Sequence, residues 1–306
     1  MDDLKQLVAA ELATPVDPRV AAMAAAIAAK HGRASRAVLF YGSCLRERRL
    51  EGLMLDFYLI VADYRGAYDR RWLAVANRLI PPNVFYFEKD GLTAKYAVLS
   101  EADFGRETGT NARSTSVWGR FAQPARLVWA SDEQPAGRIR DAVEQAAPTL
   151  FQYTIPMMQP DCGHSIADIW NRGFELTYQA ELRAERAGKA ASIVGADPDR
   201  FERFGRAALS TIATLTGVGP NGEVANLMSP EDTARWWQLM QRKGKLLSVM
   251  RLAKASATFA GGVDYIAWKI NRHAGTKIEI KPWQRRWPLL AAISLVPRLL
   301  KSGAVR

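Results

Sequence analysis

The residues best suited to chemistry lie between positions 41 and 56. Tyr41-Gly42-Ser43 forms a small turn after one apolar segment, and Asp56 lies near the start of a second, residues 54–62. A glycine lets the backbone approach phosphate groups, to which a serine hydroxyl and neighbouring N–H groups donate hydrogen bonds. A carboxylate suits Mg²⁺, which prefers oxygen ligands and shares them with phosphates. The pattern predicts a site for a triphosphate and a metal ion, although it also describes an ordinary turn between strands.

The second metal ligand is less well defined than the first. A carboxylate two residues after Asp56 would project from the same face of the strand, but that position is Tyr58. Glu88 and Asp90, which follow an apolar run at 84–87, are candidates for the missing ligand. Glu88 also fits an exposed charge at a strand end, and nucleotide phosphates and water are the other source of ligands.

Lys95 is a cation within an otherwise apolar strand, residues 94–100. A buried ammonium group is costly without an anionic partner, so its side chain is expected to reach a site or to extend into solvent. Phosphate is a natural counter-charge for it. Arg120, at the end of an expected helix, either faces the same site or simply ends that helix.

The elements that must position these residues have an α+β pattern. Apolar runs predict strands at 36–41, 54–62, 83–87, 92–99 and 126–130, among helices within 1–35 and at 72–80. After residue 131 the apolar periodicity becomes that of helices, which are expected at 132–147, 165–187 and 197–217. A further helix begins at Ser229, a capping residue followed by acidic residues.

The chain is expected to divide into three parts. These are a domain with a small mixed sheet at 1–135, a mainly helical domain at 136–275, and a basic amphipathic tail at 276–306. The apolar stretch of the tail is too short to span a bilayer but can lie in its interface. The expected membrane contacts are Trp283, Arg285, Arg286, Trp287, Leu290 and Ile293. A helix that docks on the protein core is the alternative.

Composition narrows the class of partner. The 306 residues carry a net charge of +11, which favours anionic partners such as nucleotides, nucleic acid or an anionic membrane, and also aids solubility. Two cysteines exclude a disulfide framework, and three scattered histidines do not indicate a zinc site. The first residues lack a basic and then apolar signal region, so export is not expected.

With these motifs in order, the chain resembles the phosphatidate cytidylyltransferases of the mitochondrial translocator assembly and maintenance type, in a bacterial form. The matching segments run from about residue 37 to 274: Tyr41-Gly42-Ser43, 54–57, Lys95-Tyr96, Gly119-Arg120 with Pro124, 176–183, and 256–263 with Lys269-Ile270. That family pattern also lacks a second aspartate two residues after the first. Cys44 replaces a glycine of the mitochondrial members, Phe87 stands at or near an asparagine position, and the loop before Lys95 is shorter.

The resemblance implies a nucleotidyltransferase domain of the DNA polymerase β type in residues 1–135, and transfer of CMP from CTP to phosphatidic acid with release of pyrophosphate. It implies that Tyr41, Gly42 and Ser43 bind the nucleotide. Asp56 and Lys95 would be catalytic, with Lys95 also on the nucleotide phosphates. Mg²⁺ would be the cofactor, with Asp56 as a ligand; Glu88 is the candidate for the second ligand.

The lipid side of the reaction is expected in the helical half. Tyr178, Glu181 and Arg183 are the candidates for contact with the lipid phosphate, although Glu181 and Arg183 also fit exposed helix charges. The expected partners are CTP, phosphatidic acid and an anionic membrane surface, and no nucleic acid. The expected location is peripheral, at the cytoplasmic face of the inner membrane.

Two other functions fit parts of the same pattern. A nucleotidyltransferase acting on RNA would use the net positive charge along a phosphate backbone, but no nucleic-acid-binding motif is present. A non-catalytic lipid-binding protein of the same fold would account for Tyr58 and Phe87.

Overall fold

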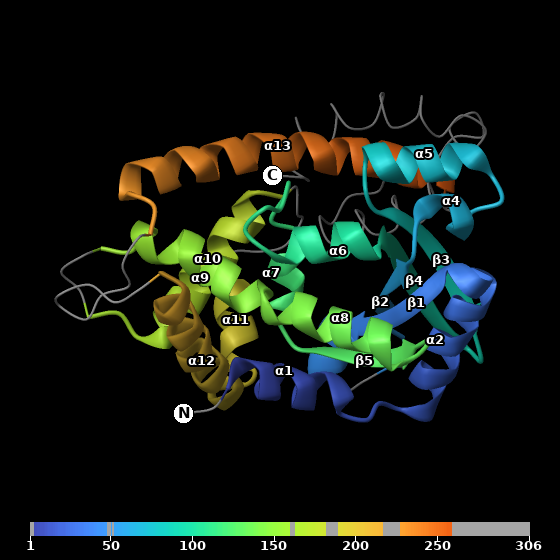
Figure 1. Cartoon of the computed structure of the whole chain (residues 1–306), viewed down its shortest axis with the longest axis horizontal. Coiled ribbons are helices and arrows are strands. Elements are labelled where there is room, and N and C mark those ends of the chain that lie inside the picture. The colour runs from blue at the N-terminus through green and yellow to red at the C-terminus, as the bar shows by residue number, and fades with distance from the viewer. Residues whose placement is uncertain are drawn as a thin grey trace.

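The computed structural model of the chain describes residues 3–47, 50, 52–159, 163–181, 189–216 and 227–258. It confirms the expected α+β class: a five-stranded mixed sheet lies beside a group of helices (Figure 1). Arg183 and the tail residues Trp283, Arg285, Arg286, Trp287, Leu290 and Ile293 lie outside the described residues.

The sheet has the strand order β3-β4-β2-β1-β5. Its strands are β1 (Ser35–Tyr41), β2 (Met54–Val61), β3 (Asn83–Lys89), β4 (Leu92–Ser100) and β5 (Ala125–Ala130). β2 and β4 are parallel, and the other neighbouring pairs are antiparallel. All five predicted strands are confirmed, and their ends differ from the prediction by one or two residues.

The helices of the first half surround this sheet. They are α1 (Leu4–Ala13), α2 (Pro18–Lys30), α3 (Ser43–Glu47), α4 (Tyr64–Ala67), α5 (Arg71–Leu79), α6 (Glu101–Thr108) and α7 (Trp118–Phe121), with a 3₁₀ turn at Gly32–Ala34. Asp17 accepts a hydrogen bond from the N–H of Arg19, and Pro18 occupies the first turn of α2, where its missing N–H is not needed. The short α3, α4 and α6 were not predicted, since so few residues show little helical periodicity. The helix expected to end at Arg120 is α7.

The second half is helical, as predicted. It contains α8 (Glu133–Glu144), α9 (Ala146–Thr154), a 3₁₀ turn at Ile155–Met157, α10 (Ile166–Gln179), α11 (Lys189–Gly195), α12 (Pro198–Thr216) and α13 (Pro230–Thr258). The prediction of one helix over 132–147 is wrong, because the helix breaks at Gln145 and a new one begins with Pro148 in its first turn. α10 ends at Gln179, earlier than predicted, and α13 starts at the expected cap, where Ser229 Oγ accepts from the N–H of Asp232.

The two faces of the sheet have different partners, because successive strand residues point to opposite sides. Leu39, Tyr58 and Ala97 belong to a core shared with the helices of the second half. Phe40, Phe57 and the other residues of the opposite face pack in a separate core with α2. The first core contains residues from Leu4 to Trp237, so it includes residues on both sides of the predicted domain boundary near residue 135. The division into domains at that boundary stays a prediction.

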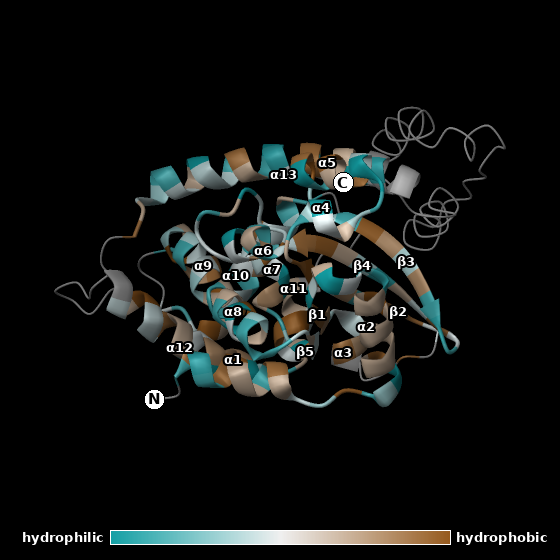
Figure 2. Ribbon diagram, turned by 45° about the vertical axis from the view of Figure 1, so that its right-hand side comes forward, coloured by the Kyte–Doolittle hydropathy of each residue, from teal (hydrophilic) through white to brown (hydrophobic). Residues whose placement is uncertain are grey.

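α13 runs along both halves of the molecule (Figures 1 and 2), and its 29 residues show mixed hydropathy in Figure 2. Gly244 lies against the end of α10, where a Cβ would come within 2.0 Å of the carbonyl oxygen of Ala180. Trp237 Nε1 donates to the carbonyl oxygen of Tyr153 at 2.7 Å. Further along, Arg251 and Lys254 donate to backbone carbonyls just after α5. In the part of the chain that the structure describes, no helix has the length and apolar character needed to cross a membrane.

Candidate active site

Gly42 and Asp56 meet at one end of the central strands. β1 and β2 pair so that Tyr41 lies opposite Asp56, which places the next residue, Gly42, against the Asp56 side chain. Gly42 has φ +98°, a conformation that other residues rarely adopt. A Cβ at this position would lie 2.9 Å from Asp56 Oδ2. Both backbone conformation and space therefore require glycine here, and Ser43 follows directly as the first residue of α3.

Asp56 and Lys95 form an ion pair across the parallel strands. The register of β2 and β4 pairs the two residues, and Lys95 Nζ lies 3.0 Å from Asp56 Oδ1. The Lys95 side chain is 29% exposed and that of Asp56 18%, so both groups can be reached from solvent. A lysine in an apolar strand was expected to need an anionic partner, and Asp56 is such a partner. An anionic ligand that binds here would meet an ammonium group, a carboxylate and an open backbone.

Glu88 and Asp90 are not brought next to Asp56. Tyr86 pairs with Lys95 and Glu88 with Thr93, so β4 separates the strand of Glu88 from that of Asp56. Two strand spacings amount to about 10 Å. Glu88 Oε2 accepts a hydrogen bond from the Tyr86 hydroxyl at 3.2 Å, and Asp90 pairs with Lys89 in the turn after β3. A role for Glu88 in metal binding stays a prediction.

A divalent cation fits this site only if it shares its ligands with a substrate. Among the described residues there is no group of three or more His, Cys, Asp or Glu side chains arranged to hold a metal ion. Mg²⁺ commonly binds through one or two carboxylates together with substrate phosphates and waters. The partly exposed carboxylate of Asp56, beside the backbone of Gly42, matches that donor set.

A second charged cluster lies further along the same face of the sheet. Arg120 Nη1 and Nη2 lie 3.0 and 3.3 Å from the two oxygens of Glu181, and Ser116 Oγ donates to Glu181 Oε1 at 2.5 Å. Burial alone would lower the pKa of Arg120, but the Glu181 carboxylate and the Tyr58 and Tyr41 hydroxyls raise it well above its usual value. Glu181 thus orients and neutralises Arg120.

Tyr58 connects this cluster with Asp56. It lies two residues after Asp56 on the same face of β2 and is buried. Burial raises the pKa of Tyr58, and the charges of Arg120, Arg251, Glu181 and Asp56 all act on it. The position that lacks a second metal ligand is therefore occupied by a buried tyrosine, whose ring packs against Phe121, next to Arg120, at 5.3 Å.

The other predicted residues have different surroundings. Tyr41 is half-buried, and its ring lies 5.3 Å from that of Tyr58. Tyr178, on α10, is half-buried and packs against the core of the helical half. The structure brings Tyr41, Gly42, Asp56 and Lys95 together and places Glu181 with Arg120. The roles proposed for Tyr178 and Glu181 at a lipid phosphate stay predictions.

Two cations of α13 were missed by the sequence analysis. Arg251 Nε donates to the carbonyl oxygen of Pro81 at 2.7 Å, and its Nη1 donates to Ser116 Oγ at 3.0 Å. Lys254 Nζ donates to the carbonyl oxygens of Ile80 and, at 2.9 Å, of Pro82. Burial and then the neighbouring Arg251 lower the pKa of Lys254 to about 7. Their spacing of three residues puts both on one face of α13, but only the tertiary structure shows which face that is.

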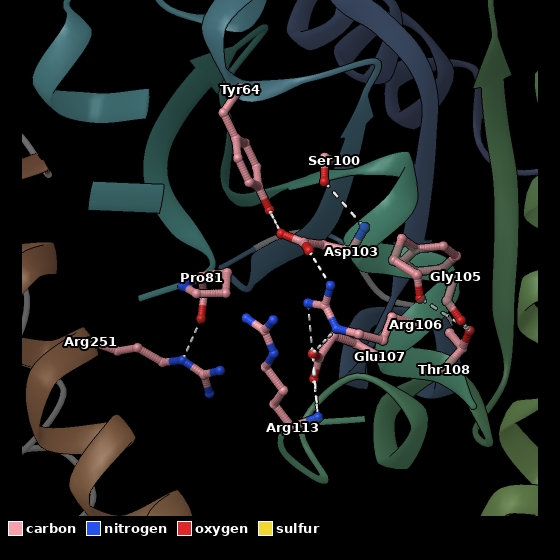
Figure 3. Close-up of polar contacts among 11 residues, drawn as sticks. Tyr64, Pro81, Ser100, Asp103, Gly105, Arg106, Glu107, Thr108, Arg113 and Arg251 are labelled. Carbon is pink, nitrogen blue, oxygen red and sulfur yellow. Dashed lines mark hydrogen bonds and ion pairs between the residues drawn. The ribbon is translucent and has the colours of Figure 1, made fainter. Parts of the chain in front are cut away.

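A third cluster of polar residues lies on and beside α6 (Figure 3). Arg106 lies 2.6 Å from Asp103 Oδ1 and 3.0 Å from Glu107 Oε1. The N–H of Arg113 donates to both oxygens of Glu107, and the Tyr64 hydroxyl donates to Asp103. Both carboxylates are thereby engaged.

Comparison with known proteins finds similar solved structures but no matching family. No protein-family model matches the chain, and no curated protein matches it. Among solved structures, the chain is similar to a nucleotidyltransferase-like protein from Exiguobacterium sibiricum at 11% sequence identity and a TM-score of 0.28, over 93% of this chain and 92% of that one.

Proposed function

We propose that the chain is a nucleotidyltransferase that transfers CMP from CTP to phosphatidic acid, forming CDP-diacylglycerol and pyrophosphate. The observation that carries nucleotidyl transfer is the meeting of Gly42, Asp56 and Lys95 at one end of β1, β2 and β4. The phosphatidate acceptor is supported by the ordered sequence resemblance described above.

The residues of this site would act mainly by position and charge. The open backbone at Gly42 and the hydroxyl of Ser43 would hold the triphosphate of CTP, and Lys95 would neutralise its negative charge. An oxygen of the acceptor phosphate would attack the α-phosphorus, forming a new P–O bond while the bond to the β-phosphate breaks and pyrophosphate leaves. Asp56 would hold Mg²⁺, which when bound neutralises charge on the phosphates.

A product assay tests this function. The purified chain would be incubated with labelled CTP, Mg²⁺ and liposomes that contain phosphatidic acid, and the lipid fraction analysed for CDP-diacylglycerol. We expect product with the wild type and a loss of at least about a hundredfold in Asp56→Ala, the order seen when one main electrostatic group is removed. Absence of product with the wild type would refute the activity, whereas equal product from Asp56→Ala would refute the site.

Membrane association is part of the same proposal. The residues after Lys281 combine tryptophans, cations and a short apolar stretch, and would hold the chain at an anionic surface on the cytoplasmic face of the inner membrane. Truncation after Lys281 is expected to reduce activity on liposomes more than it reduces CTP binding. An equal effect on both would argue that the tail docks on the protein instead.

A further inference from the structure

Arg251 is a half-buried cation held by neutral groups. Its two hydrogen bonds go to a backbone carbonyl and to a serine hydroxyl. Across the residues that the structure describes, no carboxylate lies within ion-pair distance of its guanidinium. Burial lowers the pKa of Arg251, partly offset by Tyr58 and Glu181. A cation in such a position is costly without an anionic partner, and Glu181 is already engaged by Arg120.

Arg113 adds a second guanidinium to the same region. In Figure 3 the side chains of Arg106, Arg113 and Arg251 point toward a common region below Pro81. Only the backbone N–H of Arg113 bonds to Glu107, and its guanidinium makes no hydrogen bond or ion pair with any described residue. Asp103 and Glu107, the carboxylates drawn there, are held by Arg106. The region therefore carries more positive than negative charge.

We propose that Arg113 and Arg251 bind a phosphate group. The planar fork of an arginine matches the oxygens of a phosphate, and two such groups from different elements would grip it from two sides. A chain of contacts connects this site with Asp56. Arg251 donates to Ser116, which donates to Glu181, the partner of Arg120. Phe121, next to Arg120, packs against Tyr58, which lies two residues from Asp56 on β2. Given the proposed function, on which this step rests, the ligand is the phosphomonoester of the acceptor; the terminal phosphate of the nucleotide has the same chemistry.

Binding measurements separate these two sources. Titration calorimetry would compare the wild type with Arg113→Gln, Arg251→Gln and Arg251→Lys, using dihexanoyl phosphatidic acid below its micellar concentration and, separately, Mg²⁺ with CTP. Arg206→Gln, at an exposed ion pair on α12, is the matched control. We expect Arg113→Gln and Arg251→Gln each to weaken phosphatidate binding about tenfold or more, as the loss of a charge-assisted hydrogen bond does. Arg251→Lys should recover part of the loss, and CTP binding should be unchanged.

Each outcome has a distinct meaning. Weaker CTP binding with unchanged phosphatidate binding would overturn the acceptor assignment. Unchanged binding of both probes in Arg113→Gln, whose side chain supports no described contact, would overturn the site, as would a wild type that binds neither probe. Arginine-dependent phosphatidate binding without product formation would uphold this site while refuting the proposed reaction.

A separate observation concerns the outer surface of α5. Trp72, Val75 and Leu79 are 45%, 56% and 72% exposed and lie on one side of the helix, at positions three and four apart. The inward side includes Asn77, which is buried and donates to the carbonyl oxygen of Val98 at 2.9 Å. The usual arrangement, apolar side chains inward and polar ones outward, is thus reversed at these positions.

We infer that this surface of α5 rests on an anionic lipid membrane. Arg71 and Arg78 are exposed beside the apolar side chains, and α5 contains no acidic residue. Tryptophan and leucine with flanking arginines suit the boundary between acyl chains and anionic headgroups. Since Arg251 contacts Pro81 just after α5, a lipid phosphate at this surface would lie near the proposed phosphate site.

A site-specific probe tests the α5 surface independently of the tail. Val75→Cys would carry an environment-sensitive NBD label, in a full chain whose Cys44 and Cys162 are replaced by Ala and Ser. Asp199→Cys, on α12, is the control position. With vesicles containing phosphatidylglycerol we expect a blue shift and quenching by acyl-chain spin labels at 75 and not at 199. No shift at 75 in protein that sediments with the vesicles would overturn the inference and point to another occupant, such as a protein.

Discussion

Gly42 shows how a single residue constrains the site. Its φ of +98° and the 2.9 Å approach to Asp56 Oδ2 leave no room for a side chain. The neighbourhood of Gly42 and Asp56 could be predicted, because the turn and the carboxylate adjoin successive apolar runs. The pairing of Asp56 with Lys95 could not, because it depends on β2 and β4 being parallel neighbours, which no local pattern encodes.

Gly42→Ala is expected to abolish measurable CTP binding and to lower the free energy of unfolding by about 1–3 kcal/mol through backbone strain. Gly32→Ala is the matched control, since Gly32 also has a positive φ, +53°, but nothing lies within 4 Å of a Cβ there. It should lose stability by about 1–2 kcal/mol and keep its CTP affinity. Calorimetric titration with CTP and urea denaturation measure both quantities. Wild-type CTP affinity in Gly42→Ala would contradict the site.

Glu181→Gln tests the partner of Arg120. The amide keeps the shape of the side chain but removes the charge that neutralises a buried guanidinium, so we expect a loss of about 3–5 kcal/mol in unfolding free energy. Glu175→Gln, whose pair with Arg172 is exposed and 3.5 Å long, should change stability by less than about 1 kcal/mol. Equal small effects would show that Arg120 does not depend on Glu181.

At the scale of elements, the sequence predicted the strands and the long helices better than the short helices. The five strands were predicted from their apolar runs, α12 from its helical apolar period, and the start of α13 from the cap at Ser229. The short α3, α4, α6 and α7 form where tertiary packing fixes a single turn or two. The break between α8 and α9 was predictable in principle from Pro148, but the apolar pattern continues through it.

Lys254, on α13, is expected to make the free energy of unfolding depend on pH. Its pKa is about 7 in the folded chain and about 10.4 in an unfolded one, so between these values the unfolded state holds more protons. The unfolding free energy should then rise with pH by up to about 1.4 kcal/mol per unit from pH 7 to 10, while below pH 7 the buried charge destabilises the fold. Lys254→Met should remove this slope, and Lys245→Met, at an exposed position of α13, should retain it. Denaturant titrations from pH 6 to 10 test this, and identical slopes would contradict the buried amine.

At the scale of the whole molecule, one core joins the sheet to the helical half. Arg200 on α12 supports this arrangement, since it binds Glu11 on α1 at 2.7 Å and the carbonyl oxygen of Ala122 at 3.0 Å. The sequence indicated that a helical half follows a sheet. It did not indicate that α13 returns to the sheet, because contacts between distant segments depend on side-chain packing and leave no local pattern.

Gly244→Ala tests the contact between α13 and α10. A Cβ would lie 2.0 Å from the Ala180 carbonyl oxygen, so the backbones must separate, at an expected loss of about 1–3 kcal/mol. Gly137→Ala, in α8 with nothing within 4 Å of a Cβ, should instead gain up to about 1 kcal/mol through helix propensity. Urea denaturation of both variants measures the difference. A stabilised Gly244→Ala would show that α13 does not pack there.

Because α13 is in close contact with α10 at Gly244, a tilt of α13 about this point would move Arg251. Arg251 lies seven residues beyond this contact, about 10 Å along the axis, so a tilt of about 10° would move its backbone by roughly 2 Å. Such a shift exceeds what the hydrogen bonds to Pro81 and Ser116 tolerate. A displacement of the helical half that tilts α13 would therefore break the hydrogen bonds of Arg251. The contact at Gly244 thus couples the position of the helical half to the position of the Arg251 guanidinium.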